Sequence, residues 1–480
     1  MKLLVILLLI VGGVGVFLYF PRGGSTTSAT NAATIAILNT AIEGSRAGAA
    51  FAPALDGELY ATGDLVRANL DGRGVLTFFD ASSLSVDPGS QVKVIALNRL
   101  PSDGIQVTIE QTLGRSWSSV QKLTTPDSKY EIKTPSTTAI VRGTAFLTLV
   151  QQLPNGGTQT TYQVDDGTLQ VTANAGGTVA VPAGTQVTIA EGAPAPANPT
   201  PIPPSPRLEI TGSAGMGFLA VAPTGAVCGP AGGKAEIFGC VVTGTKVTVR
   251  DPAPGRWGLF LTSGAGLSSG TITVEGFIGT SRSALRAISR TLNANDLVRS
   301  GITLTGGTTL ALSQFEELTL VNSICAATAT GRIFAGGAPD SRLDTLRSFA
   351  KDNRGVAVSV IYTEAELNQS IAAKAPTTQG VTLNDAKITI DGGGIHGSAK
   401  AAAPFITVNT SADVIGGPVG DKFTLRVSRL RADPLPPGLL DAVRGLADTS
   451  TGAFSSTIPF LVKQVSFRNG CFSVSGVTPP

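Results

Sequence analysis

Residues 136–146 read STTAIVRGTAF, and this stretch decides the fold of the N-terminal part of the chain. From position 139 to position 150 the odd residues are small or apolar, and Ile, Phe and Val recur at even positions. This pattern predicts a β run that is covered on both faces. Gly143 inside the run predicts a bulge or a close approach of another backbone segment. Arg142 needs a partner, because a buried charge without one is too costly to persist.

Several other short stretches accompany this one, and their order matches a known domain. They are residues 63–67 (GDLVR), 76–80 (LTFFD) with Ser83-Leu84 after it, 164–171 (VDDGTLQV) and 181–184 (VPAG). Together with VRGT they resemble the FecR-type domain, an extracytoplasmic all-β module of bacteria. Ala68 stands where that family usually has threonine, and Ala81 where it has glycine. The resemblance covers about residues 34–191 and implies an all-β fold there.

The partner expected for Arg142 is Asp64, from the GDLVR stretch. The hypothesis is a buried or half-buried ion pair that locks the FecR-like sheet, with Asp64, Arg142 and Gly143 as structural residues. The alternative is that Arg142 binds a ligand. Turn signals such as Asp56-Gly57 and Asp166-Gly167 recur at short intervals, which favours a sandwich, a jelly roll or a solenoid-like stack of short strands.

The N-terminal segment 3–20 contains 18 apolar or glycine residues without a charge. A helix of that length spans about 27 Å, enough for a bilayer core. We therefore expect a single-pass membrane anchor with the bulk of the chain extracytoplasmic. The alternative is a signal peptide cleaved near residues 29–33. Both alternatives place the chain outside the cytoplasm.

Because the chain is expected to be exported to an oxidising compartment, its four cysteines are expected to form disulfides. Cys228 and Cys240 are close in sequence and are expected to bridge. Cys325 and Cys471 remain, and they can pair if their segments are adjacent strands. A zinc site is not expected, because the chain has one histidine and no CxxC spacing.

The composition limits the kinds of partner that the chain is expected to bind. Charged residues are 14% of the chain and the net charge is +3, without a stripe of Lys and Arg among aromatic residues. We therefore expect no nucleic-acid partner. We also expect no cofactor. The membrane is the expected partner through segment 3–20, with lipid, envelope proteins or polysaccharide as further candidates.

The organisation after the FecR-like region follows from composition and periodicity. Residues 193–206 (APAPANPTPIPPSP) predict an extended polyproline spacer. Residues 207–337 predict a β-sandwich-like region with a helical insert at 281–299, where Leu285, Ile288, Leu292 and Leu297 are spaced for one helix face. The predicted fold class is thus mainly β and multidomain, with an N-terminal transmembrane helix and a C-terminal α+β domain.

The C-terminal region, 338–480, mixes helix and strand signals. A first helix carries Leu343, Leu346 and Phe349, and Thr363 with Glu366 predicts a capping box at the start of a second. Strands are expected at 381–390, 395–401, 405–415 and 422–429, a helix from 435, and a closing hairpin at Asn469-Gly470.

This order of elements resembles the bacterial envelope branch of the tubular lipid-binding superfamily. The matching stretches are residues 363–368 (TEAELN), 383–388 (LNDAKI) with 391–393 (DGG), Leu435-Pro436, and the final 465–476 (VSFRNGCFSVSG). The resemblance implies a sheet curled around a helix with an apolar groove between them. The candidate groove residues are Ile406, Leu439, Val443 and Val474.

Two segments match catalytic or phosphate-binding motifs, but neither has the flanking elements that its motif requires. Residues 266–270 (GLSSG) match GxSxG, but a strand pattern follows where the nucleophile elbow needs a helix. Residues 392–397 (GGGIHG) match GxGxxG, but the following stretch is too short for a phosphate-binding helix, so we expect a turn between strands. His396, in that turn, is expected to be a solvated or edge residue. The chain is therefore not expected to be an enzyme.

Three functions compete at this stage. The first is a membrane-anchored, non-enzymatic protein that binds or scaffolds at the cell envelope, with lipid as a candidate ligand. The second is a structural or adhesive surface protein without a ligand. The third is a transmembrane signalling regulator of the FecR kind, which is disfavoured because only Met1 and Lys2 precede the expected anchor.

Overall fold

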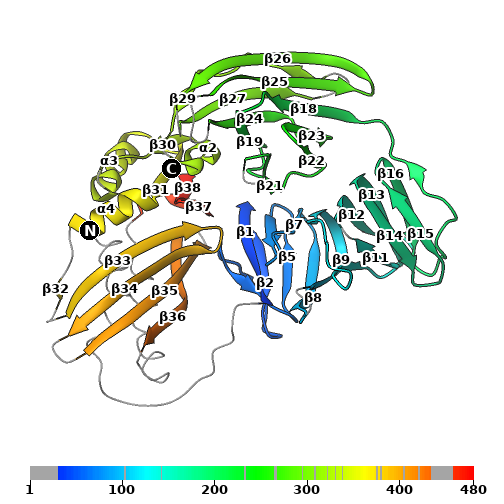
Figure 1. The fold of residues 1–480 in the computed structure, drawn as a ribbon, viewed down its shortest axis with the longest axis horizontal. Coiled ribbons are helices and arrows are strands. Elements are labelled where there is room, and N and C mark those ends of the chain that lie inside the picture. The colour runs from blue at the N-terminus through cyan, green and yellow to red at the C-terminus, as the bar shows by residue number, and fades with distance from the viewer. Residues whose placement is uncertain are drawn as a thin grey trace.

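The computed structural model describes residues 31–433 and 458–480, except positions 40, 102–103, 142, 232–233, 264–267, 294–295, 307–309, 322, 330, 338, 374–376, 379–380, 404–405 and 420–421. The described residues form three domains that are mainly β (Figure 1). None of the helices in these ranges has the length and apolar character needed to cross a bilayer. The predicted anchor, 3–20, lies outside the described residues, as does the helix predicted from 435.

The first domain consists of short strands, as the spacing of the turn signals predicts. They are β1 Ala33–Asn39, β2 Ile42–Ser45, β3 Ala52–Pro53, β4 Leu59–Tyr60, β5 Leu65–Ala68, β6 Arg73–Thr77, β7 Ser83–Val86, β8 Gln91–Arg99, β9 Ile105–Ser119, β10 Lys129–Lys133, β11 Thr137–Val141, β12 Ala145–Gln152, β13 Thr158–Asp166, β14 Thr168–Ala173, β15 Thr178–Pro182, β16 Thr185–Ala190 and β17 Thr200–Pro201.

These strands form two layers that share β9. One layer has the order β4-β1-β6-β7-β9-β12-β13-β16-β17. The other has the order β3-β2-β5-β8-β9-β10-β11-β14-β15. Alternating apolar residues of both layers meet in one core, which includes Val66, Tyr130, Phe146 and Tyr162.

The VRGT stretch is the crossing between these two layers. The expected single run is divided into β11 in one layer and β12 in the other. Gly143 lies between them with a φ of 108°, and a Cβ there would meet Lys122 Cα at 2.9 Å. The predicted close backbone approach is therefore confirmed, and the left-handed conformation explains why glycine is required.

The second domain is a β-sandwich. Its strands are β18 Pro206–Gly212, β19 Gly217–Val221, β20 Val227–Gly229, β21 Lys234–Ala235, β22 Cys240–Thr243, β23 Lys246–Arg250, β24 Gly255–Thr262, β25 Ser268–Ile278, β26 Ser281–Leu292, β27 Leu297–Thr305, β28 Ala311–Leu312 and β29 Thr319–Leu320. The order β22-β23-β18-β25-β26 forms one sheet, and β21-β20-β19-β24-β27-β28, with β29 beside β27, forms the other. Phe218, Val247 and Trp257 are buried between them.

The helix predicted at 281–299 is wrong. Residues Ser281–Leu292 form β26, which pairs with β25 along its whole length. Ala284, Ile288 and Leu292 lie on one side of the strand at even positions, whereas Leu285 is exposed. The apolar spacing imitated a helix face, and pairing with the neighbouring long strand decided the outcome.

The proline-rich segment 193–206 is held against the first domain and does not extend freely. Thr200–Pro201 pairs with β16, and the Ile202 N–H donates to Gly184 O at 2.9 Å. The Ala195 N–H donates to Gly176 O at 3.0 Å. Carbonyl groups in the turns before β15 and before β16 thus accept the few N–H groups that the prolines leave.

The third domain contains helices and two sheets. Its elements are α2 Ile324–Thr328, β30 Arg332–Phe334, α3 Pro339–Asp352, β31 Ala357–Thr363, α4 Glu364–Ala373, β32 Thr377–Thr378, β33 Val381–Asp391, β34 Gly394–Ala403, β35 Ile406–Val419, β36 Lys422–Asp433, β37 Leu461–Arg468 and β38 Cys471–Val477. The sheets have the orders β30-β31-β38-β37 and β32-β33-β34-β35-β36. Because β30 pairs with β31, this domain begins before residue 338.

Local signals in this domain are confirmed. The Glu366 N–H donates to Thr363 Oγ1 at 3.2 Å, and the Thr363 N–H donates to the Glu366 carboxylate at 3.0 Å. This is the predicted capping box. The final hairpin turns at Asn469-Gly470, between β37 and β38, and Gly392-Gly393 is the expected turn between β33 and β34.

Candidate functional site at the domain junctions

The three domains meet around β1. Strand β37 is the edge of its sheet, and it lies along β1 of the first domain (Figure 1). Gln464 Nε2 donates to Ile37 O at 3.1 Å across this contact. Leu38, the next residue of β1, and Val75 of the neighbouring β6 are buried in the core of the sandwich. The first domain is therefore packed against both others.

Asp56 connects the first domain to the third. Its carboxylate accepts one hydrogen bond from the Ile37 N–H, where a bulge interrupts β1, and another from the Phe467 N–H at 2.8 Å. The side chain is buried, with 1% of the residue exposed. Burial raises the pKa of Asp56 to about 7, although the two N–H donors and Arg468 oppose the rise. Asp56 is thus a buried acid that two domains share.

Glu236 brings the second domain into the same junction. Arg468 Nη1 lies 3.6 Å from the Glu236 carboxylate, which also accepts the Val227 N–H at 3.2 Å. The backbone oxygen of Glu236 accepts the Ser85 hydroxyl of the first domain at 2.7 Å. Glu236 is buried as well and has Arg468 as its ion-pair partner, and the charge of Arg468 also opposes the rise in the pKa of Asp56.

The Asp56-Gly57 turn is a second point of contact with the third domain. Gly57 has a φ of 82°, and a Cβ there would meet Gly393 O at 2.9 Å. The Gly416 N–H donates to Asp56 O at 3.3 Å. Only glycine allows the tip of the β33–β34 hairpin to approach this closely.

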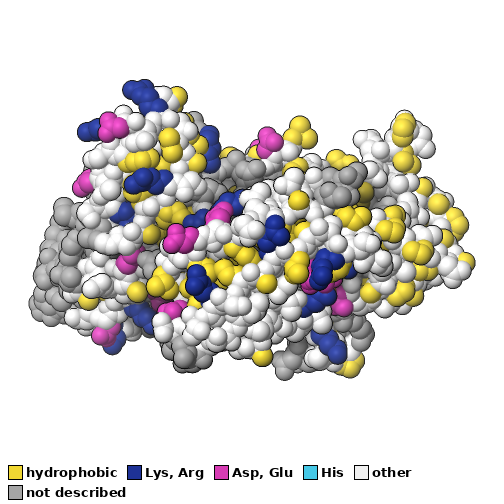
Figure 2. All heavy atoms as spheres, turned by 90° about the horizontal axis from the view of Figure 1, so that it is seen from above, with side chains coloured by type: hydrophobic (Ala, Val, Ile, Leu, Met, Phe, Trp, Pro, Cys, Tyr) yellow, Lys and Arg dark blue, Asp and Glu magenta, His cyan; other side chains and the backbone are white. Residues whose placement is uncertain are grey.

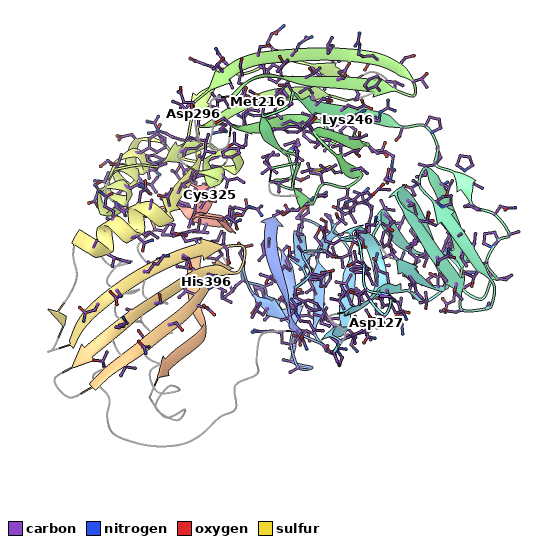
Figure 3. All side chains as sticks on the ribbon, viewed as in Figure 1. Asp127, Met216, Lys246, Asp296, Cys325 and His396 are labelled. Carbon is purple, nitrogen blue, oxygen red and sulfur yellow. A yellow bond between two sulfur atoms is a disulfide. The ribbon has the colours of Figure 1, made fainter. Side chains whose placement is uncertain are left out.

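His396 lies near that hairpin tip and braces it (Figure 3). Nε2 lies 2.8 Å from Asp391 and Nδ1 lies 2.8 Å from Asp413, so three strands are joined by one imidazole. Hydrogen bonds to Asp391 and then Asp413 raise the pKa of His396 to about 10. The side chain is half-buried and charged, and its position is structural.

The single histidine offers a direct measurement of this clamp. Because its folded-state pKa is raised, the stability it contributes is present below pH 6.5 and is lost as the pH rises through about 10. We expect the imidazole C–H resonances of the whole protein to titrate with a midpoint well above 8, and Asp413→Asn to lower that midpoint. A wild-type midpoint near 6.5 contradicts the clamp.

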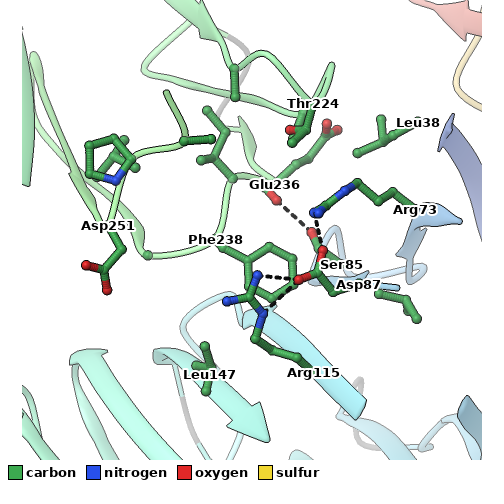
Figure 4. A pocket seen from close by; sticks show the side chains of 18 of the residues that line it. Leu38, Arg73, Ser85, Asp87, Arg115, Leu147, Thr224, Glu236, Phe238 and Asp251 are labelled. Carbon is green, nitrogen blue, oxygen red and sulfur yellow. Dashed lines mark hydrogen bonds and ion pairs between the residues drawn. The ribbon is translucent and has the colours of Figure 1, made fainter. Parts of the chain in front are cut away.

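A cavity of about 140 Å³ lies between the first and second domains (Figure 4). Arg73 and Arg115 both donate to Asp87 at its wall, with Arg115 Nε at 2.7 Å, and Arg115 stacks on the Phe238 ring. Arg250 nearby holds Asp165 through two hydrogen bonds of 2.8 Å. Each of these guanidinium groups has a carboxylate partner, so the seam is an ion-paired interface.

The two-sided covering of β12 has its origin at this seam. Ala145 and Leu147 on the outer face of β12 pack with Trp117 and with Phe238 and Val241 of the second domain. The apolar residues on both faces of the VRGTAF stretch therefore reflect domain docking. The sequence signal was correct, and the covering surface comes from a distant part of the chain.

The predicted lock between Asp64 and Arg142 stays a prediction, because Arg142 lies outside the described residues. Asp64 is buried, and its carboxylate accepts the N–H groups of Ala47 at 2.9 Å and Ala61 at 2.8 Å. These bonds brace the loops around β5. The lock that the structure does show is Arg342, which is buried and contacts Glu366 at 3.0 Å and carbonyl oxygens of Gly336 and Ile361.

Both cysteine pairs lie at disulfide distance. Cys228 and Cys240 have Cα atoms 6.7 Å apart and join the two sheets of the sandwich. Cys325 and Cys471 have Cα atoms 6.1 Å apart and join α2 to the start of β38. From the sequence, the second pair was expected to form if its segments were adjacent strands. It joins a helix and a strand instead.

The candidate lipid groove is described only at one residue. Val474 is buried in the core of the third domain, packed among residues such as Phe467 and Phe472. Leu439 and Val443 lie outside the described residues, and no side-chain position is described for Ile406. Lipid binding in this groove therefore stays a prediction.

The junction residues Asp56, Glu236 and Arg468 were not found from the sequence. Asp56 was interpreted only as part of a turn, which it also is. Surface charge does not mark the junction either. Figure 2 shows basic and acidic side chains interspersed on the face seen from above. The signal that existed was a short polar segment, residues 56–58 (DGE), directly after the apolar residues 51–55 (FAPAL).

Comparisons with known proteins identify the first domain. Residues 64–170 match the model of the family described as FecR protein, from the residue before β5 into β14. The chain therefore contains a FecR domain. No curated protein matches the chain.

Solved structures give a weaker likeness. Two crystal structures of a protein from Parabacteroides distasonis ATCC 8503, described as a "putative anti-sigma factor", match 26% of this chain, with TM-scores of 0.23 and 0.22 and identities of 14% and 15%. The chain spans 55% of the length of each of them. Likeness at this level carries no functional argument.

Proposed function

We propose that this protein is a non-catalytic binding scaffold of the cell envelope, exported from the cytoplasm, in which the FecR domain is held in a fixed orientation by the two other domains. The observation that carries the proposal is the buried junction of Asp56, Glu236 and Arg468. A buried carboxylate that accepts N–H groups from two domains resists separation of those domains, because separation leaves polar groups without partners.

Other features support this proposal. The FecR domain is an extracytoplasmic module in the family that its motifs resemble. Two buried cysteine pairs at disulfide distance suit an oxidising compartment. The ionisable residues at the seams, such as Arg250 with Asp165 and His396 with Asp413, are engaged with one another and hold elements together. These roles are structural.

A signalling regulator is the second candidate function. The FecR match at residues 64–170 favours it, since the family is best known in iron signalling. In that case the junction would transmit a change from one domain to the next. The structural or adhesive function without a ligand differs from the scaffold only in having no binding partner.

Thiol labelling in cells tests the proposal. Cells producing the full chain are quenched with acid, and the unfolded protein is treated with a maleimide with and without prior reduction, because all four thiols are buried in the folded chain. We expect labelling of the four cysteines only after reduction, because oxidation after export pairs them. Free thiols before reduction contradict an extracytoplasmic scaffold. Loss of expression of one specific operon on deletion of the gene would favour the signalling regulator instead.

A further inference from the structure

A second cavity between domains differs from the first because the Nε of an arginine in its wall has no hydrogen-bond partner in the part of the chain that the structure describes. It has a volume of about 530 Å³ and lies between the sandwich and the segment from α2 to β30 of the third domain. Arg299, on β27, lines it. The Arg299 Nε is buried, and no hydrogen-bond partner for it exists among the described residues. Native proteins rarely leave such a donor unsatisfied, so the Arg299 Nε is available to an acceptor atom on a bound group.

The surroundings of Arg299 favour an anion. Arg256 lines the same cavity, but its fork is occupied by the Glu316 carboxylate through hydrogen bonds of 2.6 and 2.5 Å. Glu317 also lines the cavity and is exposed to solvent. Burial lowers the pKa of Arg299 and the charge of Arg256 lowers it further, although Glu316 opposes them. An anion bound in addition to Glu316 would relieve the repulsion between Arg299 and Arg256, and it would accept a hydrogen bond from Arg299 Nε.

Part of the cavity lining is apolar. Leu320, Val321 and Ile333 contribute to it, and 68% of Leu320 is exposed. An exposed leucine near a guanidinium whose Nε lacks an acceptor matches a ligand with an anionic head and an apolar body. The volume is large enough for a chain of several carbons.

We propose that this cavity binds a small amphiphilic carboxylate, with its head on Arg299 and its apolar body on Leu320. This site is separate from the candidate lipid groove and does not depend on the scaffold function. Two sources share the chemistry: a free aliphatic acid, and the C-terminal apolar residue of a peptide.

Isothermal titration of the full chain with octanoate tests the site. We expect octanoate to bind, and to bind at least tenfold more tightly than acetate or octanol, because each of those lacks one half of the recognition. Arg299→Gln is expected to weaken octanoate binding at least tenfold, and Leu320→Ser to weaken it several-fold. Arg290→Gln is the matched control, since Arg290 is exposed on β26. N-acetyl-leucine, run beside octanoate, assigns the source by which of the two binds more tightly.

Two results would overturn the proposal. One is the absence of octanoate binding to the wild-type chain. The other is equal binding by wild type and Arg299→Gln. Arg299 makes no hydrogen bond to the described residues, so its replacement is not expected to prevent folding. If it does, octanoate binding to the wild-type chain is measured at about 50 mM and about 500 mM NaCl. Binding that does not weaken at the higher salt concentration contradicts a guanidinium contact.

Discussion

Asp56→Ala is expected to lower the free energy of unfolding by about 2–5 kcal/mol at pH 5, because the buried N–H groups of Ile37 and Phe467 each lose their acceptor. The unfolding transition monitored by circular dichroism in a urea series gives this value. Asp64→Ala is the matched control, since Asp64 is also buried and also accepts two backbone N–H groups, but within one domain.

The cost of this substitution is expected to shrink as the pH rises. Burial raises the pKa of Asp56 from its ordinary value of 3.8 to about 7, so the folded state binds the proton more tightly. Stability contributed by the protonated carboxyl is therefore lost as the pH rises toward and through 7, by an amount on the order of 4 kcal/mol. Arg468 and Glu236 face Asp56 across the junction, and their charges act on its pKa in opposite directions. A difference between wild type and variant that grows from pH 5 to pH 8 contradicts the burial of Asp56.

Removal of the Cys325–Cys471 bridge is expected to have the other large effect. The two cysteines are 146 residues apart, and the chain-entropy relation gives about 5 kcal/mol for a loop of that size. Both side chains are buried, so the Cys325→Ala, Cys471→Ala variant also loses contacts with Ile361. Thermal unfolding of the third domain is expected to shift to a clearly lower temperature.

The bridge in the sandwich provides the comparison. Cys228 and Cys240 are separated by 12 residues, for which the same relation gives about 3 kcal/mol. The Cys228→Ala, Cys240→Ala variant is therefore expected to lose less stability than the other double variant. A larger loss for the short loop would show that native contacts around Cys228, and not loop closure, dominate.

Local and family-level features of this fold could be predicted from the sequence. The capping box of Thr363 and Glu366 depends on residues three positions apart, so the pattern contains all the information. The glycine at 143 was recognisable because few other reasons exist for a glycine within an apolar β run. The FecR motifs identified the first domain, and the closeness of Cys228 and Cys240 in sequence left Cys325 and Cys471 as the second pair.

The rest depended on contacts between distant segments. Asp56 and Phe467 are 411 positions apart, and no periodicity connects them. The apolar residues of β26 fit both the helical and the strand period, so the sequence alone predicted a helix. Pairing with β25 makes this segment a strand. Arg299 was not singled out, because its missing partner is a property of the packed seam and not of the residues near it in sequence.

Hydrogen exchange at the Asp56 junction shows whether one buried carboxylate ties the FecR domain to the third domain. In the wild-type protein, the amides of Ile37 and Phe467 are expected to exchange slowly. In Asp56→Ala both are expected to exchange faster together, while amides of β14 in the same FecR domain keep their rate. Faster exchange at Ile37 with no change at Phe467 would contradict the account, because it would show that the two domains do not share Asp56.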